Sequence, residues 1–290
     1  MRAIAEFAMR GRTQAVAVAA ISAAIPLLFW MSAAVIALTS LRKGWEQGLI
    51  LLLWSCLPAA LWWLMQGDPS PVLVIFGTYI LAVVLRTSMS WMFVLAVGCL
   101  IGIIVTGVVP SLLPELMAGA VEIGKQQLGE MTTEMAQASG HSVEDWLQAL
   151  FAGVIGAIHT VVIIVSLILA RWWQSSLYNP GGFKAEFQQL RLPKKAAIPL
   201  MLMAFFGSGI HPLILGWMPV LLVPFLIAAI ALVHGLVAIK SLSGNWLVVF
   251  YLAMFFAGPW MFLLLNMLAF VDSMVDFRAR VKAQQNDGDT

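Results

Sequence analysis

The chain has 290 residues, of which 61% are hydrophobic and only 10% are charged, and its mean hydropathy is +0.94. Soluble globular proteins carry about 25% charged residues, so this composition excludes a water-soluble fold. The net charge of +2 is too small to indicate binding to nucleic acid. Apolar runs of roughly twenty residues that do not alternate with polar ones predict helices in a lipid bilayer and exclude a transmembrane β-barrel.

The first elements are a basic tail and a long apolar stretch. Residues 1–12 contain three arginines against one glutamate and predict a cytoplasmic anchor. Residues 14–41 are too long for one upright span and have Pro26 near their middle. We expect a hairpin of two short helices there, with one kinked, tilted helix as the alternative. Further spans are expected at 48–65, 71–86, 88–109, 147–170, 197–212, 216–239 and 246–271.

Hydrophilic segments separate these spans. Residues 110–146 carry six acidic side chains against Lys125 alone, with apolar residues at helical spacing, and predict an amphipathic helix outside the membrane. Within this segment, Ser142 is expected to cap the helix that follows. Residues 171–195 form a basic connector, and residues 273–290 form a polar tail.

The distribution of basic residues predicts the topology. Lys and Arg accumulate on the cytoplasmic side of membrane proteins. With a hairpin at 14–41, the N-terminus and the 171–195 connector are cytoplasmic, and the acidic 110–146 segment is periplasmic. The fold class is therefore predicted as all-α, a single integral membrane domain over residues 1–290 with eight or nine membrane segments. Nine crossings would put the basic tail outside, so one late segment interrupted by proline is expected not to cross.

The sequence contains no motif of a known enzyme class, such as GxSxG, HExxH, a Walker P-loop or GxGxxG. It therefore predicts a non-enzymatic protein without a metal or cofactor. Polar and aromatic residues inside apolar spans are the candidates for ligand binding. Hydrogen bonds between helices and an interfacial aromatic belt are the alternatives. The candidates are Trp30, Trp91, His159 and His234.

Two features are candidates for docking a partner. Ala15, Ala19 and Ala23 put small side chains on one helix face, which serves either packing within the bundle or docking of another membrane subunit. In the connector, Asn-Pro-Gly-Gly predicts a tight turn before a short amphipathic helix. This elbow is either a structured loop or a binding site for a partner protein. Its residues are Asn179, Pro180, Gly181, Gly182, Phe183 and Phe187.

The end of the last span is expected to form charge pairs. Asp272 and Asp276 are four residues apart, and Arg280 follows Asp276 at the same spacing, so Asp276 and Arg280 are expected to pair on one helix face. Asp272 closes an apolar span and is expected to need a partner such as Arg171 or Arg191.

Three stretches of sequence resemble a known family. They are Arg-Trp-Trp-Gln…Leu-Tyr-Asn-Pro-Gly-Gly-Phe from Arg171, Asp-x-x-x-Asp-Phe-Arg from Asp272, and the early Ala-rich stretch that ends in Leu-Arg-Lys-Gly. They resemble the YybS-like family of bacterial membrane proteins, whose function is unknown. That family is distantly similar to the S components of energy-coupling-factor transporters. S components bind vitamins or metal ions and dock on a membrane coupling subunit through an Ala-x-x-x-Ala stripe.

The resemblance implies an S-component-like core in the bacterial inner membrane. Such a protein would bind a small hydrophobic or vitamin-like ligand near the outer leaflet, beneath residues 110–146. Its partner would be a membrane coupling subunit docked on Ala15, Ala19 and Ala23, which match the stripe in place and spacing. The alternative is a membrane scaffold or assembly factor, which would hold other proteins through the 171–195 elbow and the tail.

Overall fold

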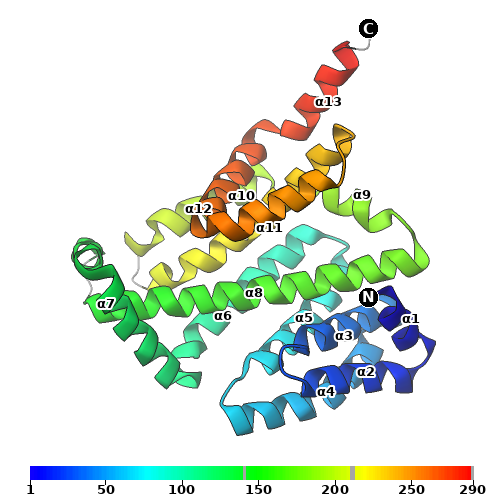
Figure 1. Cartoon of the computed structure of the whole chain (residues 1–290), viewed down its shortest axis with the longest axis horizontal. Coiled ribbons are helices and arrows are strands. Elements are labelled where there is room, and N and C mark those ends of the chain that lie inside the picture. Colours follow the sequence, from blue (N-terminus) through cyan, green and yellow to red (C-terminus); the bar gives the residue numbers. More distant parts are fainter. Residues whose placement is uncertain (140–141, 210–212, 289–290) are drawn as a thin grey trace.

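The computed structural model describes residues 1–139, 142–209 and 213–288, and these residues form an all-helical bundle without strands (Figure 1). Residues 140–141 of the predicted 110–146 segment, 210–212 of the predicted span 197–212, and 289–290 of the predicted tail lie outside the described residues. In chain order the elements are α1 (Arg2–Arg10), α2 (Arg12–Ala24), α3 (Phe29–Lys43), α4 (Trp45–Gln66), α5 (Ser70–Ser88), α6 (Trp91–Leu112), α7 (Pro114–Ser139), α8 (Val143–Tyr178), α9 (Gly182–Gln188), α10 (Lys194–Phe206), the 3-10 turn η1 (Gly207–Gly209), α11 (Leu213–Ile239), α12 (Asn245–Val275) and α13 (Phe277–Gly288).

The central element is α8, which runs between the N-terminal helices on one side and α10–α13 on the other (Figure 1). Its 36 residues make it about 54 Å long, well beyond the ~30 Å hydrocarbon core of a bilayer. It begins where predicted, because the Ser142 hydroxyl accepts a hydrogen bond of 3.1 Å from the amide of Asp145. Helices α3, α5, α6 and α11 all pack on it.

Small residues on α8 allow the backbones of neighbouring helices to come into contact with the backbone of α8. A Cβ atom on Gly153 would lie 2.0 Å from the carbonyl oxygen of Gly216 in α11. A Cβ atom on Gly156 would lie 2.8 Å from the carbonyl oxygen of Gly102 in α6. Since lipid provides no hydrophobic drive for helix association, such close packing is what holds these helices together.

Six helices are long and apolar enough to cross a membrane, which identifies a multi-pass membrane protein. They are α4, α5, α6, α8, α11 from Ile214, and α12. The expected count of eight or nine spans is not supported, because α2, α3 and α10 have only 13, 15 and 13 residues. At 1.5 Å per residue these helices reach about 20–22 Å, which is short of a full hydrocarbon core.

The predicted hairpin at residues 14–41 is present. Helix α2 ends at Ala24, the chain turns through Leu27 in a left-handed conformation, and α3 packs back on α2. Every residue of α3 from Ser32 to Leu41 is buried. The hairpin therefore supplies the innermost helix of the N-terminal half.

Helix α12 is a V of two shorter helices and does not run straight. Gly258 has φ 50° and ψ −126°, outside the helical region, and Pro259 begins the returning half. The first half meets α11 where Tyr251 contacts His234. After the second half, Arg278 lies against Gly235, one residue further along α11. Both ends of α12 therefore lie at the same end of the bundle, and its two halves run in opposite directions.

All of the 16 lysines and arginines except Lys125 lie at the end of the bundle where α8 and α11 finish, which we call the basic end. Hydrogen bonds join its segments, from Arg86 and Gln174 to the carbonyl of Leu41 and from Gln285 to the carbonyl of Ile239. The opposite, acidic end holds α7 and the start of α8. Because α12 bends back, the C-terminal tail lies at the basic end.

Candidate ligand-binding cavity

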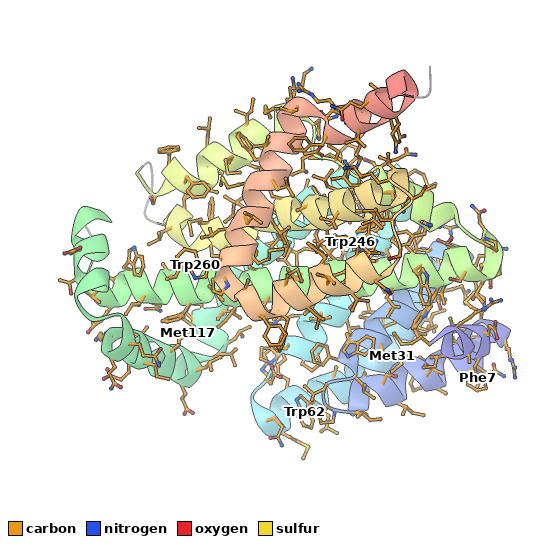
Figure 2. The ribbon with its side chains drawn as sticks, turned by 45° about the horizontal axis from the view of Figure 1, so that its top comes forward. Phe7, Met31, Trp62, Met117, Trp246 and Trp260 are labelled. Carbon is orange, nitrogen blue, oxygen red and sulfur yellow. The ribbon has the colours of Figure 1, made fainter. Side chains whose placement is uncertain are left out.

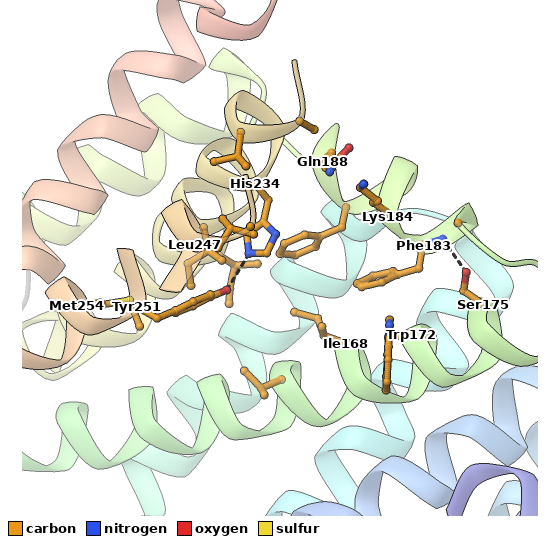
Figure 3. A pocket seen from close by; sticks show the side chains of 18 of the residues that line it. Ile168, Trp172, Ser175, Phe183, Lys184, Gln188, His234, Leu247, Tyr251 and Met254 are labelled. Atoms are coloured by element: carbon orange, nitrogen blue, oxygen red, sulfur yellow. Dashed lines mark hydrogen bonds between the residues drawn. The ribbon is translucent and has the colours of Figure 1, made fainter. Parts of the chain in front are cut away.

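A cavity of about 980 Å³ lies at the basic end between α8, α9, α11 and the first half of α12 (Figure 3). Pockets for small molecules span roughly 300–1,000 Å³, so this cavity is at the upper end of that range. Its inner walls are aliphatic, with Val161 and Ile168 from α8, Ile227 and Ile230 from α11, and Met254 from α12. Such walls exclude water and favour an apolar ligand.

One hydrogen-bonded pair interrupts the apolar walls. His234 Nε2 and the Tyr251 hydroxyl lie 2.8 Å apart and point toward each other at one side of the cavity (Figure 3). The ring of Phe187 meets the edge of the His234 ring with centroids 5.8 Å apart. The cavity can therefore offer both a flat aromatic surface and a hydrogen-bonding group to a ligand.

The sequence folds α9 back over the cavity through the predicted Asn-Pro-Gly-Gly turn. Gly181 adopts φ 86°, a conformation that glycine tolerates best. The Ser175 hydroxyl then accepts a hydrogen bond of 2.9 Å from the amide of Phe183 and donates one of 2.7 Å to the carbonyl of Asn179. These bonds hold α9 with its phenylalanines facing inward.

Phe183 and Phe187 are both buried and line the cavity, so they do not present a surface for docking a partner. They continue a row of rings from Trp91 through Phe183 and Phe187 to His234, with successive centroids 6.3, 5.5 and 5.8 Å apart. The elbow was expected either as a structured loop or as a partner site, and its aromatic face is occupied inside the protein. Asn179, Pro180 and Gly181 remain exposed at the turn.

Charged side chains lock α9 to its neighbours. Glu186 accepts a hydrogen bond from the Trp91 indole and forms an ion pair of 2.6 Å with Arg171. Arg171 is therefore the partner of Glu186 and not of Asp272. Trp91 holds α9 in place from behind Phe183 and does not line the cavity.

A second group of charges, which we call the clasp, consists of Arg191, Asp272, Asp276 and Arg278. Arg191 pairs with Asp276, and Arg278 pairs with Asp272 at 3.2 Å while donating a hydrogen bond of 3.0 Å to the carbonyl of Leu190. Burial lowers the pKa of the Arg278 guanidinium, and the nearby carboxylates of Asp272 and Asp276 act in the opposite direction. The clasp ties the α9–α10 connection to the junction of α12 and α13.

The expected pairing of Asp276 with Arg280 is absent from the described residues. Asp276 adopts a left-handed conformation with φ 56°, which ends α12 and starts α13 at the next residue. The spacing of four residues brings side chains together only along one continuous helix. Arg280 instead donates a hydrogen bond of 3.2 Å to the carbonyl of Val275.

The four residues proposed for ligand binding do not meet at one place. His234 lines the cavity, whereas Trp91 lies behind it and Trp30 lies half-buried in the first turn of α3. His159 Nδ1 donates to the Ile155 carbonyl at 2.8 Å, so Nε2 accepts the Ser70 hydroxyl at 3.1 Å. His159 thus links α8 to α5, which was the alternative to a ligand contact.

The Ala15, Ala19 and Ala23 face is covered within the protein. All three side chains are buried, and α2 packs on α3 and α4. Alanines allow this close approach, so the stripe serves packing inside the bundle. It is not a free face on which a coupling subunit could dock.

A ligand site beneath the acidic segment does not match the main cavity, which lies at the opposite end. A smaller cavity of about 390 Å³ lies at the acidic end, where Thr106, Asp145 and Trp217 are among its lining residues. No described residue of α7 lines either cavity. The amphipathic helix packs mainly along α8, and its own Met117 is buried against residues of α6 and α8.

Three residues of the main site were missed by the sequence analysis. Tyr251 and Lys184 line the cavity, and Glu186 anchors α9. Lys184 and Glu186 flank the two phenylalanines of the predicted amphipathic helix, so their position near them could have been inferred. The contact of Tyr251 with His234 joins two spans and leaves no local signal in the sequence.

Among the described residues, no group of three or more His, Cys, Asp or Glu side chains lies together in a way that could hold a metal ion. The sequence matches no family model, and no curated protein and no solved structure matches it. The resemblance to the YybS-like family therefore stays a prediction. The cavity is the feature of the structure that bears on function.

Proposed function

We propose that this chain is a non-enzymatic membrane protein that binds a small hydrophobic ligand in the cavity at its basic end. The observation that carries the proposal is the cavity itself, about 980 Å³ with aliphatic walls and one hydrogen-bonding pair, His234 and Tyr251. A ligand of this kind suits a substrate-binding component of a transport system. The YybS-like and S-component-like assignments belong to this proposal.

We further propose that the basic end faces the cytoplasm of a bacterium and that the protein lies in the inner membrane. The separation of charge supports this orientation, because Lys125 is the one basic residue at the acidic end. The N-terminus and the C-terminal tail are then both cytoplasmic. In this arrangement α2, α3 and α10 are short membrane segments beside the six longer helices, which brings the segments to the expected eight or nine.

Docking of a membrane coupling subunit remains part of the proposal, but through a face other than the alanine stripe. The outer side of α12 is strongly apolar, and Figure 2 shows Trp246 and Trp260 along this helix at the outside of the bundle. The scaffold alternative has less support, because Phe183 and Phe187 of its binding elbow are buried.

The test is native mass spectrometry of the purified full chain. We expect the wild type to carry a bound small molecule, and Ile230→Trp to lose it because the larger indole obstructs the aliphatic part of the cavity. Leu252→Trp is the matched control, since Leu252 lies next to Tyr251 but is exposed and does not line the cavity. Absence of any ligand from the wild type, or its retention by Ile230→Trp, would contradict the proposal.

A further inference from the structure

The cavity is elongated along the helix axes. Its lining residues on α8 run from Val161 to Ser176, and those on α11 run from Leu226 to Ala238. At 1.5 Å per residue, the stretch of α8 alone covers about 22 Å. One half of a bilayer's hydrocarbon core is about 15 Å thick. The shape therefore suits a long chain lying parallel to the helices better than a compact ring system.

The cavity is open on its side. Helix α12 packs on α11 and α10, and α8 lies on the other side of α11, so the groove between α8 and α12 has α11 as its floor. Val165 on α8 and Tyr251 on α12 stand at its two edges, with 50% and 41% of their surfaces exposed. Both residues lie on apolar helices, so in the proposed membrane orientation the opening faces lipid.

Apart from the His234–Tyr251 pair in its wall, the groove has its polar groups at one end. The inner end is aliphatic, whereas the lining toward the basic end includes Ser176, Lys184, Gln188 and Ser241. Figure 3 shows Lys184 and Gln188 at this mouth. Lys184 is exposed and forms none of the ion pairs of the described residues, because the nearest carboxylate along α9, Glu186, pairs with Arg171. The mouth therefore presents an unneutralised positive charge beside hydroxyl and amide groups.

We propose that the groove binds an amphiphile from the surrounding leaflet, with its hydrocarbon chain between α8 and α12 and its acidic headgroup at Lys184. This inference rests on the proposed function and names the class of ligand. The inner apolar walls match the chain, and the polar mouth matches a phosphate or carboxylate at the membrane surface. The occupant enters sideways from the bilayer, so it does not pass through water.

The full chain is reconstituted in nanodiscs that contain equal amounts of phosphatidylglycerol and phosphatidylcholine, with a small fraction of oleic acid. Native mass spectrometry after release identifies what remains bound. Lys184→Gln removes the positive charge that would meet the headgroup, and Ile230→Trp places a larger side chain in the site of the hydrocarbon chain. Lys43→Gln is the control, because Lys43 is a lysine at the same end that lies outside the cavity. We expect wild type and Lys43→Gln to retain an acidic amphiphile, Ile230→Trp to retain none, and Lys184→Gln to lose about fivefold of its preference over phosphatidylcholine.

The bound mass separates a phospholipid from a fatty acid, and either one supports the inference. Equal retention of lipid by all four proteins would show lipid at the outer surface only and would overturn it. A bound molecule that is not an amphiphile, lost from Ile230→Trp, would overturn this inference while leaving the proposed function intact. No bound molecule in any protein would overturn both.

Discussion

The clasp predicts that Arg278→Met strongly destabilises the protein. The Arg278 and Asp272 side chains are only 10% and 3% exposed, and no described cation other than Arg278 pairs with Asp272. The substitution leaves the carboxylate with the amide of Phe277 as its remaining contact and leaves the Leu190 carbonyl without its donor. Breaking a buried ion pair from one side costs about 3–5 kcal/mol.

The measurement is denaturant unfolding in detergent micelles, with a double-mutant cycle that adds Asp272→Asn. Asp272→Asn removes the buried negative charge that Arg278→Met leaves unpaired. The double variant should therefore lose less unfolding free energy than the sum of the losses of the two single variants. Arg2→Met is the control, because Arg2 and Glu6 form a pair that is 64% and 47% exposed, worth at most about 1 kcal/mol. If Arg278→Met cost no more than Arg2→Met, the clasp would not be a buried anchor and the reasoning would be refuted.

Three further predictions follow from the packing and from the charge separation. In a background without native cysteines, cysteines placed at Ala185 and Gln284 should label from the same side of the membrane, and one at Lys125 from the opposite side. Gly153→Leu should prevent folding or lower yield sharply, because its first added carbon would lie 2.0 Å from a backbone oxygen of α11. Gly258→Ala should cost about 1–3 kcal/mol of unfolding free energy, because it forces a side chain into φ 50°.

A glycine without close neighbours gives the matched control for both substitutions. Gly107 lies within α6 and a Cβ atom there would meet nothing within 4 Å, so Gly107→Ala should be neutral or slightly stabilising. Normal yield of Gly153→Leu would show that α8 and α11 are further apart than described. Opposite labelling of positions 185 and 284 would show that α12 crosses the membrane and does not return.

Features that depend on neighbouring residues could be predicted from the sequence. Pro26 divides the first apolar stretch into α2 and α3, and Ser142 caps α8, because turns and caps are local. The amphipathic segment before α8 was likewise visible from its charge. The basic residues of the tail led us to expect one late segment that does not cross the membrane, but the sequence did not show that α12 bends back at Gly258.

Features that depend on contacts between residues far apart in the sequence could not be predicted from it. Arg191 was expected to meet Asp272 but pairs with Asp276, because the left-handed turn at Asp276 points that carboxylate toward the α9–α10 connection. Phe187 was assigned to a partner surface but packs against His234. Spacing along one helix says which face a side chain occupies, but not which other helix covers that face.

The V of α12 affects how the topology of this chain should be measured. The contacts that hold its returning half at the basic end come after it, through Asp276 and Arg278. A reporter enzyme fused at residue 275 would lack both residues, and α12 has the length and hydropathy of an ordinary span. We therefore expect such a truncated fusion to place its reporter in the periplasm, whereas a fusion to the complete chain reports the cytoplasm. The residue at which the reporter is fused would therefore decide on which side of the membrane the end of the chain is assigned.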